Sequence, residues 1–63
     1  MLFMARFYDT TDSSDLKRVE GLLKKGGIVY TLRVVEDRTA LIKEIQVAEE
    51  DLADAERILY GTS

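Results

Sequence analysis

The side chains that most often carry out chemistry in enzymes are scarce in this 63-residue chain, which contains no His and no Cys. His is the usual general base and a common metal ligand, and the Cys thiolate is both a nucleophile and a zinc ligand. Ser13 and Ser14 have no His to activate them as nucleophiles, so we interpret them as helix-capping residues. The acidic run 49–51 is ordinary for the first turn of a helix and predicts no metal site. We therefore expect a protein that is not an enzyme and that holds no metal or other cofactor.

Arg6, Arg33 and Glu44 are the remaining candidates, because the strand period of two places all three on one face of a predicted sheet. The carboxylate of Glu44 would lie on the central strand, between two guanidinium groups. One interpretation is a solvent-exposed ladder of cross-strand charges, which fixes strand pairing at about a few tenths of a kcal/mol per contact. The other is an interface or a site for an anion, because apolar residues surround the charges. Those residues are Leu2, Met4, Tyr8, Val29, Val35 and Ile42.

The N-terminal half of the chain predicts a strand followed by a helix. Residues 2–8 alternate in the strand period, with Phe3, Ala5 and Phe7 on one face and Tyr8 on the other. The polar run 9–14 predicts a loop that ends in a helix N-cap at position 12, 13 or 14. A helix follows over 15–25, because apolar residues recur there at helical spacing and two glycines at 26 and 27 end it.

The C-terminal half predicts a hairpin and a second helix. Strands over 28–35 and 41–47 are joined by the turn 36–39. With Asp37 and Arg38 at its tip, the pairing partners are Tyr30 with Ile45 and Leu32 with Lys43. Lys43 is then the one charged residue on a mainly apolar face, where it would extend from the sheet's edge or be redirected by a bulge. The second helix begins at residue 48, and Gly61 ends it.

The predicted element order, strand, helix, strand, strand, helix, defines the fold class. A right-handed crossover with the third strand between the first two gives an α+β, two-layer βαββα sandwich of the ferredoxin-like (split βαβ) type. Its three-stranded sheet has the order 1-3-2, with two helices on one face and residues 1–63 in a single domain. The fourth strand of the complete fold is missing, which leaves the strand over 2–8 as an unprotected edge.

Size and charge restrict the classes of partner. A chain this short buries only about 60% of the surface that its unfolded form exposes, so we expect it to associate with a second copy, as a homodimer or a larger homo-oligomer. Residues 1–33 carry six basic and four acidic residues (+2) and residues 34–63 carry three and eight (−5), which sum to the net charge of −3. A net acidic chain argues against nucleic-acid binding. No run reaches the about 18 apolar residues of a membrane span, and the N-terminus does not have the form of a secretory signal, so we expect a cytoplasmic protein without membrane contact.

Two segments resemble a known bacterial family. Residues 16–28, a helix with the Leu22-Leu23 pair followed by a polar stretch and Gly27-Ile28, are similar to one recurring pattern of that family. Residues 47–52 and 55–59 look like its closing strand and helix, although Val47-Ala48 stands where the family commonly has Val-Pro. The family is the small prokaryotic signal-transducing protein domain, a domain of unknown function grouped with PII-like proteins. The resemblance implies a ferredoxin-like, often self-associating domain with a regulatory role, and it carries no catalytic or ligand-binding residue onto this chain.

The sequence thus predicts a non-enzymatic regulatory or protein-interaction module that self-associates through its first strand or through the open face of its sheet. The alternative is a sensor that binds an anionic metabolite between subunits through Arg6 and Arg33.

Overall fold

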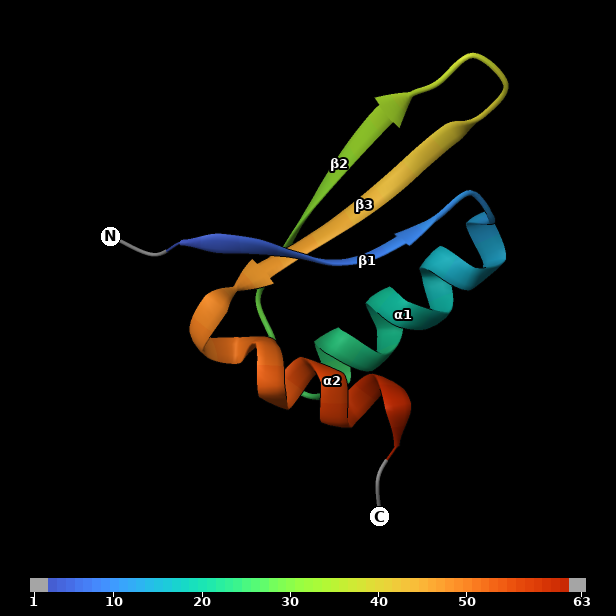
Figure 1. Cartoon of the computed structure of the whole chain (residues 1–63). Coiled ribbons are helices and arrows are strands. Elements are labelled where there is room, and N and C mark those ends of the chain that lie inside the picture. The colour runs from blue at the N-terminus through green and yellow to red at the C-terminus, as the bar shows by residue number, and fades with distance from the viewer. Residues whose placement is uncertain (1–2, 62–63) are drawn as a thin grey trace.

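The structure, a computed structural model, describes residues 3–61. Its elements follow the predicted order: strand β1 (Met4–Thr10), helix α1 (Ser13–Lys25), strands β2 (Tyr30–Glu36) and β3 (Leu41–Ala48), the 3₁₀ turn η1 (Glu49–Asp51) and helix α2 (Leu52–Tyr60). The three strands form one antiparallel sheet in the order β1-β3-β2. Figure 1 shows α1 and α2 on the same side of that sheet, which confirms the predicted α+β fold class.

Local signals place the ends of both helices. Of the three predicted N-cap positions, Asp12 is the one used: its Oδ1 accepts a hydrogen bond of 2.8 Å from the backbone N–H of Ser14. Gly27 follows the end of α1 with a φ of 75°, and Gly61 follows α2 with a φ of 60°. Only glycine adopts this left-handed conformation without a steric penalty.

The β2–β3 hairpin has the predicted faces but not the predicted register. Tyr30 pairs with Val47 and Leu32 with Ile45, so the expected partners were wrong by two residues. The loop accounts for the difference, because the backbone N–H of Asp37 bonds the carbonyl of Ala40 at 2.9 Å and moves the tip to residues 38–39. A shift of two residues keeps every side chain on its face.

A β-bulge in β1 overturns one predicted orientation. Arg6 pairs with Gln46 and Tyr8 pairs with Ile45, so Phe7 is an extra residue with no partner of its own. Beyond this bulge the alternation is reversed, which turns Tyr8 to the helix side and Asp9 to the open side of the sheet. The sequence placed Tyr8 on the open face, and a regular strand would have kept it there. The bulged strand also continues to Thr10, into the predicted loop.

The core is small and lies under one part of the sheet. Among the described residues its buried cluster comes from α1, β3 and α2, namely Leu16, Val19, Leu23, Ile45, Val47 and Ala55. Phe7, Tyr8, Ile28, Tyr30, Leu52 and Leu59 pack around them. Phe3, which the strand alternation places on the same face as Ala5 and Phe7, lies outside this core and is 67% exposed, and the outer half of the hairpin extends beyond the helices. None of the helices within residues 3–61 is long and apolar enough to cross a membrane.

Candidate interaction surface

The open face of the sheet brings Arg6 and Glu44 together, as the strand alternation predicted. Arg6 Nε lies 3.3 Å from Glu44 Oε2, and Gln46 Nε2 donates a hydrogen bond of 2.7 Å to Glu44 Oε1. These neighbours cover Glu44, which is only 5% exposed although it lies on the face away from the helices. Both carboxylate oxygens therefore have a partner, and this satisfies the usual requirement for a buried charge.

The same face does not assemble a receptor for an anion. The bulge turns Asp9 to this side, where Asp9 Oδ2 lies 4.0 Å from Arg6 Nη1. The carboxylates of Asp9 and Glu44 therefore flank one guanidinium group. Arg33 is directly opposite Glu44 in the strand register, yet it makes no ion pair within 4.0 Å among the described residues. Because Arg6 is already neutralised, the cation pair expected from the sequence reduces to one available guanidinium, that of Arg33. Asp9 and Gln46 were missed by the sequence reasoning. Only the bulge brings Asp9 to this face, whereas the alternation that places Glu44 there also places Gln46, two residues further along β3.

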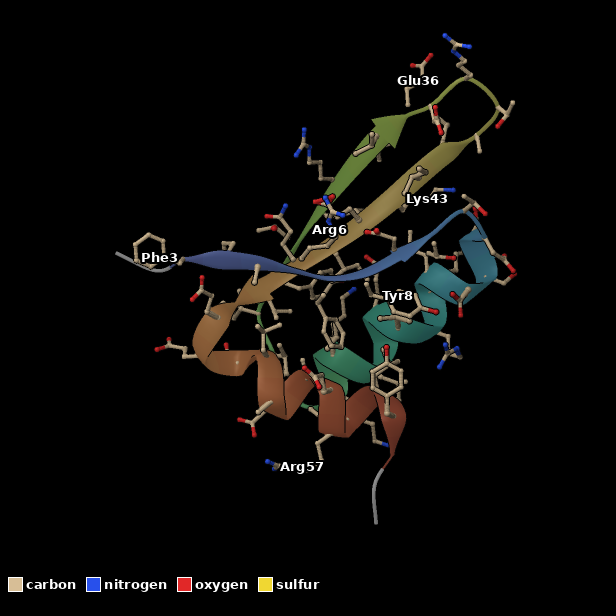
Figure 2. All side chains as sticks on the ribbon, in the orientation of Figure 1. Phe3, Arg6, Tyr8, Glu36, Lys43 and Arg57 are labelled. Atoms are coloured by element: carbon tan, nitrogen blue, oxygen red, sulfur yellow. The ribbon has the colours of Figure 1, made fainter. Side chains whose placement is uncertain are left out.

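The other predicted site residues have different positions. Met4 pairs with Ala48 at one end of the open face and is 38% exposed. Leu2 lies outside the described residues. Figure 2 shows Arg6 on the side of the sheet away from the helices and Tyr8 beside α1. Tyr8 is thus separated from the charged cluster by the sheet itself.

Tyr8 belongs to a polar contact that attaches β1 to α1. Its hydroxyl donates a hydrogen bond of 2.6 Å to Asp15 Oδ2, and Arg18 Nη2 donates one of 2.8 Å to Asp15 Oδ1. The hydrogen bond from Tyr8, followed by the one from Arg18, holds the pKa of the Asp15 carboxyl below its usual value. The hydrogen bond to Asp15, and then burial, raises the pKa of Tyr8. Because both carboxylate oxygens of Asp15 accept hydrogen bonds, from Tyr8 and from Arg18, we interpret the three side chains as a structural contact between β1 and α1.

Two further side chains connect α1 to the hairpin. The hydroxyl of Tyr30 on β2 donates a hydrogen bond of 2.9 Å to Glu20 Oε2, and burial, with this hydrogen bond, raises the pKa of Tyr30. Lys43 Nζ contacts Ser13 Oγ at 3.4 Å, at the first residue of α1. The charged residue on the apolar face therefore extends from the central strand to the start of a helix, and not from the sheet's edge.

The outer half of the hairpin presents an apolar surface that no helix covers. Leu32 and Val34 on β2 are 44% and 55% exposed, and Leu41 on β3 is 50% exposed. All three lie on the helix side of the sheet, because they alternate with Arg33 and Ile42 along their strands. We call Leu32, Val34 and Leu41 the hairpin patch. The sequence predicted their face, but strand alternation does not show how far the helices extend over it.

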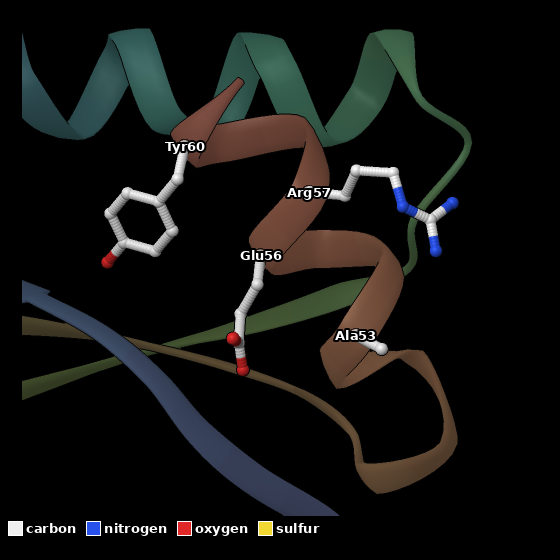
Figure 3. Close-up of a pocket in the computed structure, with 4 residues that line it drawn as sticks. All are labelled: Ala53, Glu56, Arg57 and Tyr60. Carbon is white, nitrogen blue, oxygen red and sulfur yellow. The ribbon is translucent and has the colours of Figure 1, made fainter. Parts of the chain in front are cut away.

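A shallow depression on α2 is a weaker candidate for a binding site than the hairpin patch. Its volume is about 300 Å³, and it is lined by Ala53, Glu56, Arg57 and Tyr60. Figure 3 shows Glu56 and Arg57 pointing in different directions from the helix, so their charges do not meet at one point. Arg57 is also paired with Asp54 at 3.3 Å.

No family model, curated protein or solved structure matches this chain. The resemblance to the signal-transducing family therefore remains an expectation from the sequence. Within residues 3–61 the structure contains no group of three or more Asp or Glu side chains arranged to hold a metal ion.

Proposed function

We propose that this protein is a non-enzymatic interaction module that self-associates through its sheet. The hairpin patch carries the proposal, because Leu32, Val34 and Leu41 are 44%, 55% and 50% exposed on a chain whose enclosed core is small. These three residues lie on one face, with Lys43 opposite Val34 and Glu36 opposite Leu41, and uncovered apolar side chains grouped on one face are typical of protein interfaces. The family resemblance implies a regulatory role, and a protein with that role would act as the proposed homo-oligomer.

The alternative, an anionic-metabolite sensor, has less support from the geometry. Arg6 Nη1 lies 4.0 Å from Asp9 Oδ2, and Arg6 Nε lies 3.3 Å from Glu44 Oε2. An anion that binds Arg6 would therefore have to displace one of these carboxylates or approach both of them. Arg33 is exposed, but one guanidinium group among polar and apolar neighbours is a weak site for an anion.

The mass of the protein in solution tests the proposal. Sedimentation equilibrium over a range of micromolar to millimolar concentrations should show a dimer or a larger species in reversible exchange with the monomer. The midpoint of thermal unfolding should rise with protein concentration, because association stabilises the folded state by mass action. A monomeric mass and a constant midpoint over the whole range would contradict self-association.

A further inference from the structure

The two free edges of the sheet differ in how well they can accept another strand. β1 carries the bulge at Phe7, and bulged edges are poor templates for pairing. β2 pairs with β3 over seven consecutive positions without a shift in register. Its sequence, Tyr-Thr-Leu-Arg-Val-Val-Glu, contains no Pro or Gly and is rich in β-branched and aromatic residues. β2 is therefore the regular edge of this sheet.

The hairpin patch adjoins that same edge. Leu32 and Val34 belong to β2 and are exposed on its helix side, and Figure 1 shows the outer part of this strand extending beyond the helices. An edge of seven residues is about 23 Å long at about 3.3 Å per residue. A backbone strip of this length falls short of the about 800 Å² per partner that a standard interface buries. The β2 side chains that border the edge, Leu32 and Val34, would add to the buried surface, and about 800 Å² is about one sixth of the 4646 Å² that the chain exposes.

We propose that a second copy of this chain pairs with β2 in an antiparallel arrangement, around a two-fold axis at Leu32. The proposal rests on the self-association proposed above and assigns it to one edge. The product is a continuous sheet of six strands in the order β1-β3-β2-β2-β3-β1, with the helices of both copies on one side.

Side-chain chemistry selects the register. A two-fold axis perpendicular to the sheet pairs residues of the same face, so the axis passes midway between one residue of β2 and the same residue of its copy. An axis at Arg33 would place two guanidinium groups directly opposite each other, which is destabilising. An axis at Val34 would place Leu32, in the middle of the edge, opposite Glu36 of the second copy and Arg33 opposite Val35. With the axis at Leu32, Leu32 meets its own copy and Val34 meets Tyr30 of the second copy.

The register with the axis at Leu32 also gives Arg33 and Val35 favourable partners on the second copy. Arg33 lies opposite Thr31 of the second copy, a small residue with a hydroxyl, and keeps Glu44 as its neighbour on β3. Val35 lies opposite Val29 of the second copy, whose side chain is 77% exposed in the single chain. Val34 with Tyr30 on the helix side and Val35 with Val29 on the open side are thus apolar pairs, while Glu36 lies opposite Ile28 of the second copy at the end of the paired segment.

Cysteine cross-linking tests this register, because the chain has no Cys of its own. In Leu32→Cys the two thiols lie opposite each other at the axis, with Cβ atoms about 5 Å apart, close to disulfide distance. In Val34→Cys they are about 13 Å apart along the strands, and Met4→Cys places the thiol on β1. Under mild oxidation, Leu32→Cys should form covalent dimer at least about tenfold faster than either control.

A charge substitution provides a second measurement. Leu32→Lys places two cations against each other at the axis and should weaken dimerisation by about a hundredfold or more. Because Leu32 is 44% exposed, the single chain should still fold, as circular dichroism will show. Tyr60→Lys, at a residue of α2 that is 64% exposed, is the matched control and should leave the dissociation constant unchanged.

The outcomes separate the two proposals. A wild-type chain that is monomeric at every concentration overturns both. A wild-type dimer that cross-links through Met4→Cys faster than through Leu32→Cys, or that is unaffected by Leu32→Lys, overturns the β2 assignment and leaves self-association standing. Fast cross-linking at Leu32 together with loss of the dimer in Leu32→Lys supports the assignment.

Discussion

Replacement of Gly26 by Ala should destabilise the protein, although the backbone there suits any residue. Gly26 has φ −82° and ψ −1°, in the right-handed helical region. A Cβ at this position would overlap Ile58 Cδ1 of α2 and lie 3.3 Å from Ile58 Cγ1. Gly26 is therefore the point where the end of α1 touches α2.

The change in the free energy of unfolding of Gly26→Ala combines one stabilising and one destabilising contribution. Ala restricts the unfolded chain and would by itself stabilise the fold by about 0.4–1 kcal/mol. Displacement of the half-buried side chain of Ile58, which faces Gly26, costs about 1–3 kcal/mol. The free energy of unfolding of Gly26→Ala should therefore fall by about 1 kcal/mol. Gly21→Ala is the matched control, because no atom lies within 4 Å of the added Cβ in the middle of α1, and it should raise the free energy of unfolding by about 0.5–1 kcal/mol.

A double-mutant cycle identifies the contact. Ile58→Val removes the Cδ1 atom and should itself cost about 0.5–1 kcal/mol. In that background Gly26→Ala should become neutral or stabilising, a coupling of about 1 kcal/mol between the two positions. Urea unfolding followed by circular dichroism at one fixed, low protein concentration measures all four chains without a contribution from association. If Gly26→Ala costs the same in the wild-type and in the Ile58→Val background, or if it stabilises as Gly21→Ala does, the packing argument is wrong.

Two further predictions concern the polar contacts. The pKa of Asp15 is below its usual value of 3.8, so its stabilising contribution is complete above that value and is lost as the pH falls through the lower, folded pKa. The thermal midpoint of Asp15→Asn should therefore fall less than that of wild type between about pH 4 and pH 2, and an equal fall in both would count against the contact. Glu44→Ala removes a carboxylate that is 5% exposed and leaves Gln46 and Arg6 without their partner, so urea unfolding should show a loss of about 1–2 kcal/mol. Glu49→Ala, at an exposed residue, should change the free energy of unfolding by less than about 0.5 kcal/mol, and equal losses in the two variants would contradict the role of Glu44.

The sequence predicts the fold well because its signals are local and repeated. Apolar spacing, capping residues and glycines indicate two helices and three strands, and strand alternation alone brings Arg6 and Glu44 to one face. The hairpin register depends on which residues form the tip, and two different tips satisfy the same alternation. The side of Tyr8 depends on the bulge at Phe7, which turns its hydroxyl toward Asp15 of α1 and which no alternation of residue types in β1 indicates. Exposure of the hairpin patch depends on helix placement, which no strand pattern encodes.

The outer hairpin is also the part of the sheet with the fewest strands. The pairing of β1 with β3 ends where Thr10 meets Lys43, so Ile42 and Leu41 are paired with β2 only. A two-stranded ribbon is marginally stable in water and usually needs a third strand or a packed face.

Pairing around Leu32 would place Ile28, Val29 and Tyr30 of the second copy opposite residues 36, 35 and 34. The segment that lacks a third strand in the single chain would then gain one. Self-association and the order of the hairpin should therefore be coupled: amide hydrogen exchange of Val34 and Val35 should slow as protein concentration rises, while that of buried Val19 in α1 should change less. Equal slowing at both places would mean that association acts on the whole fold and not on this edge.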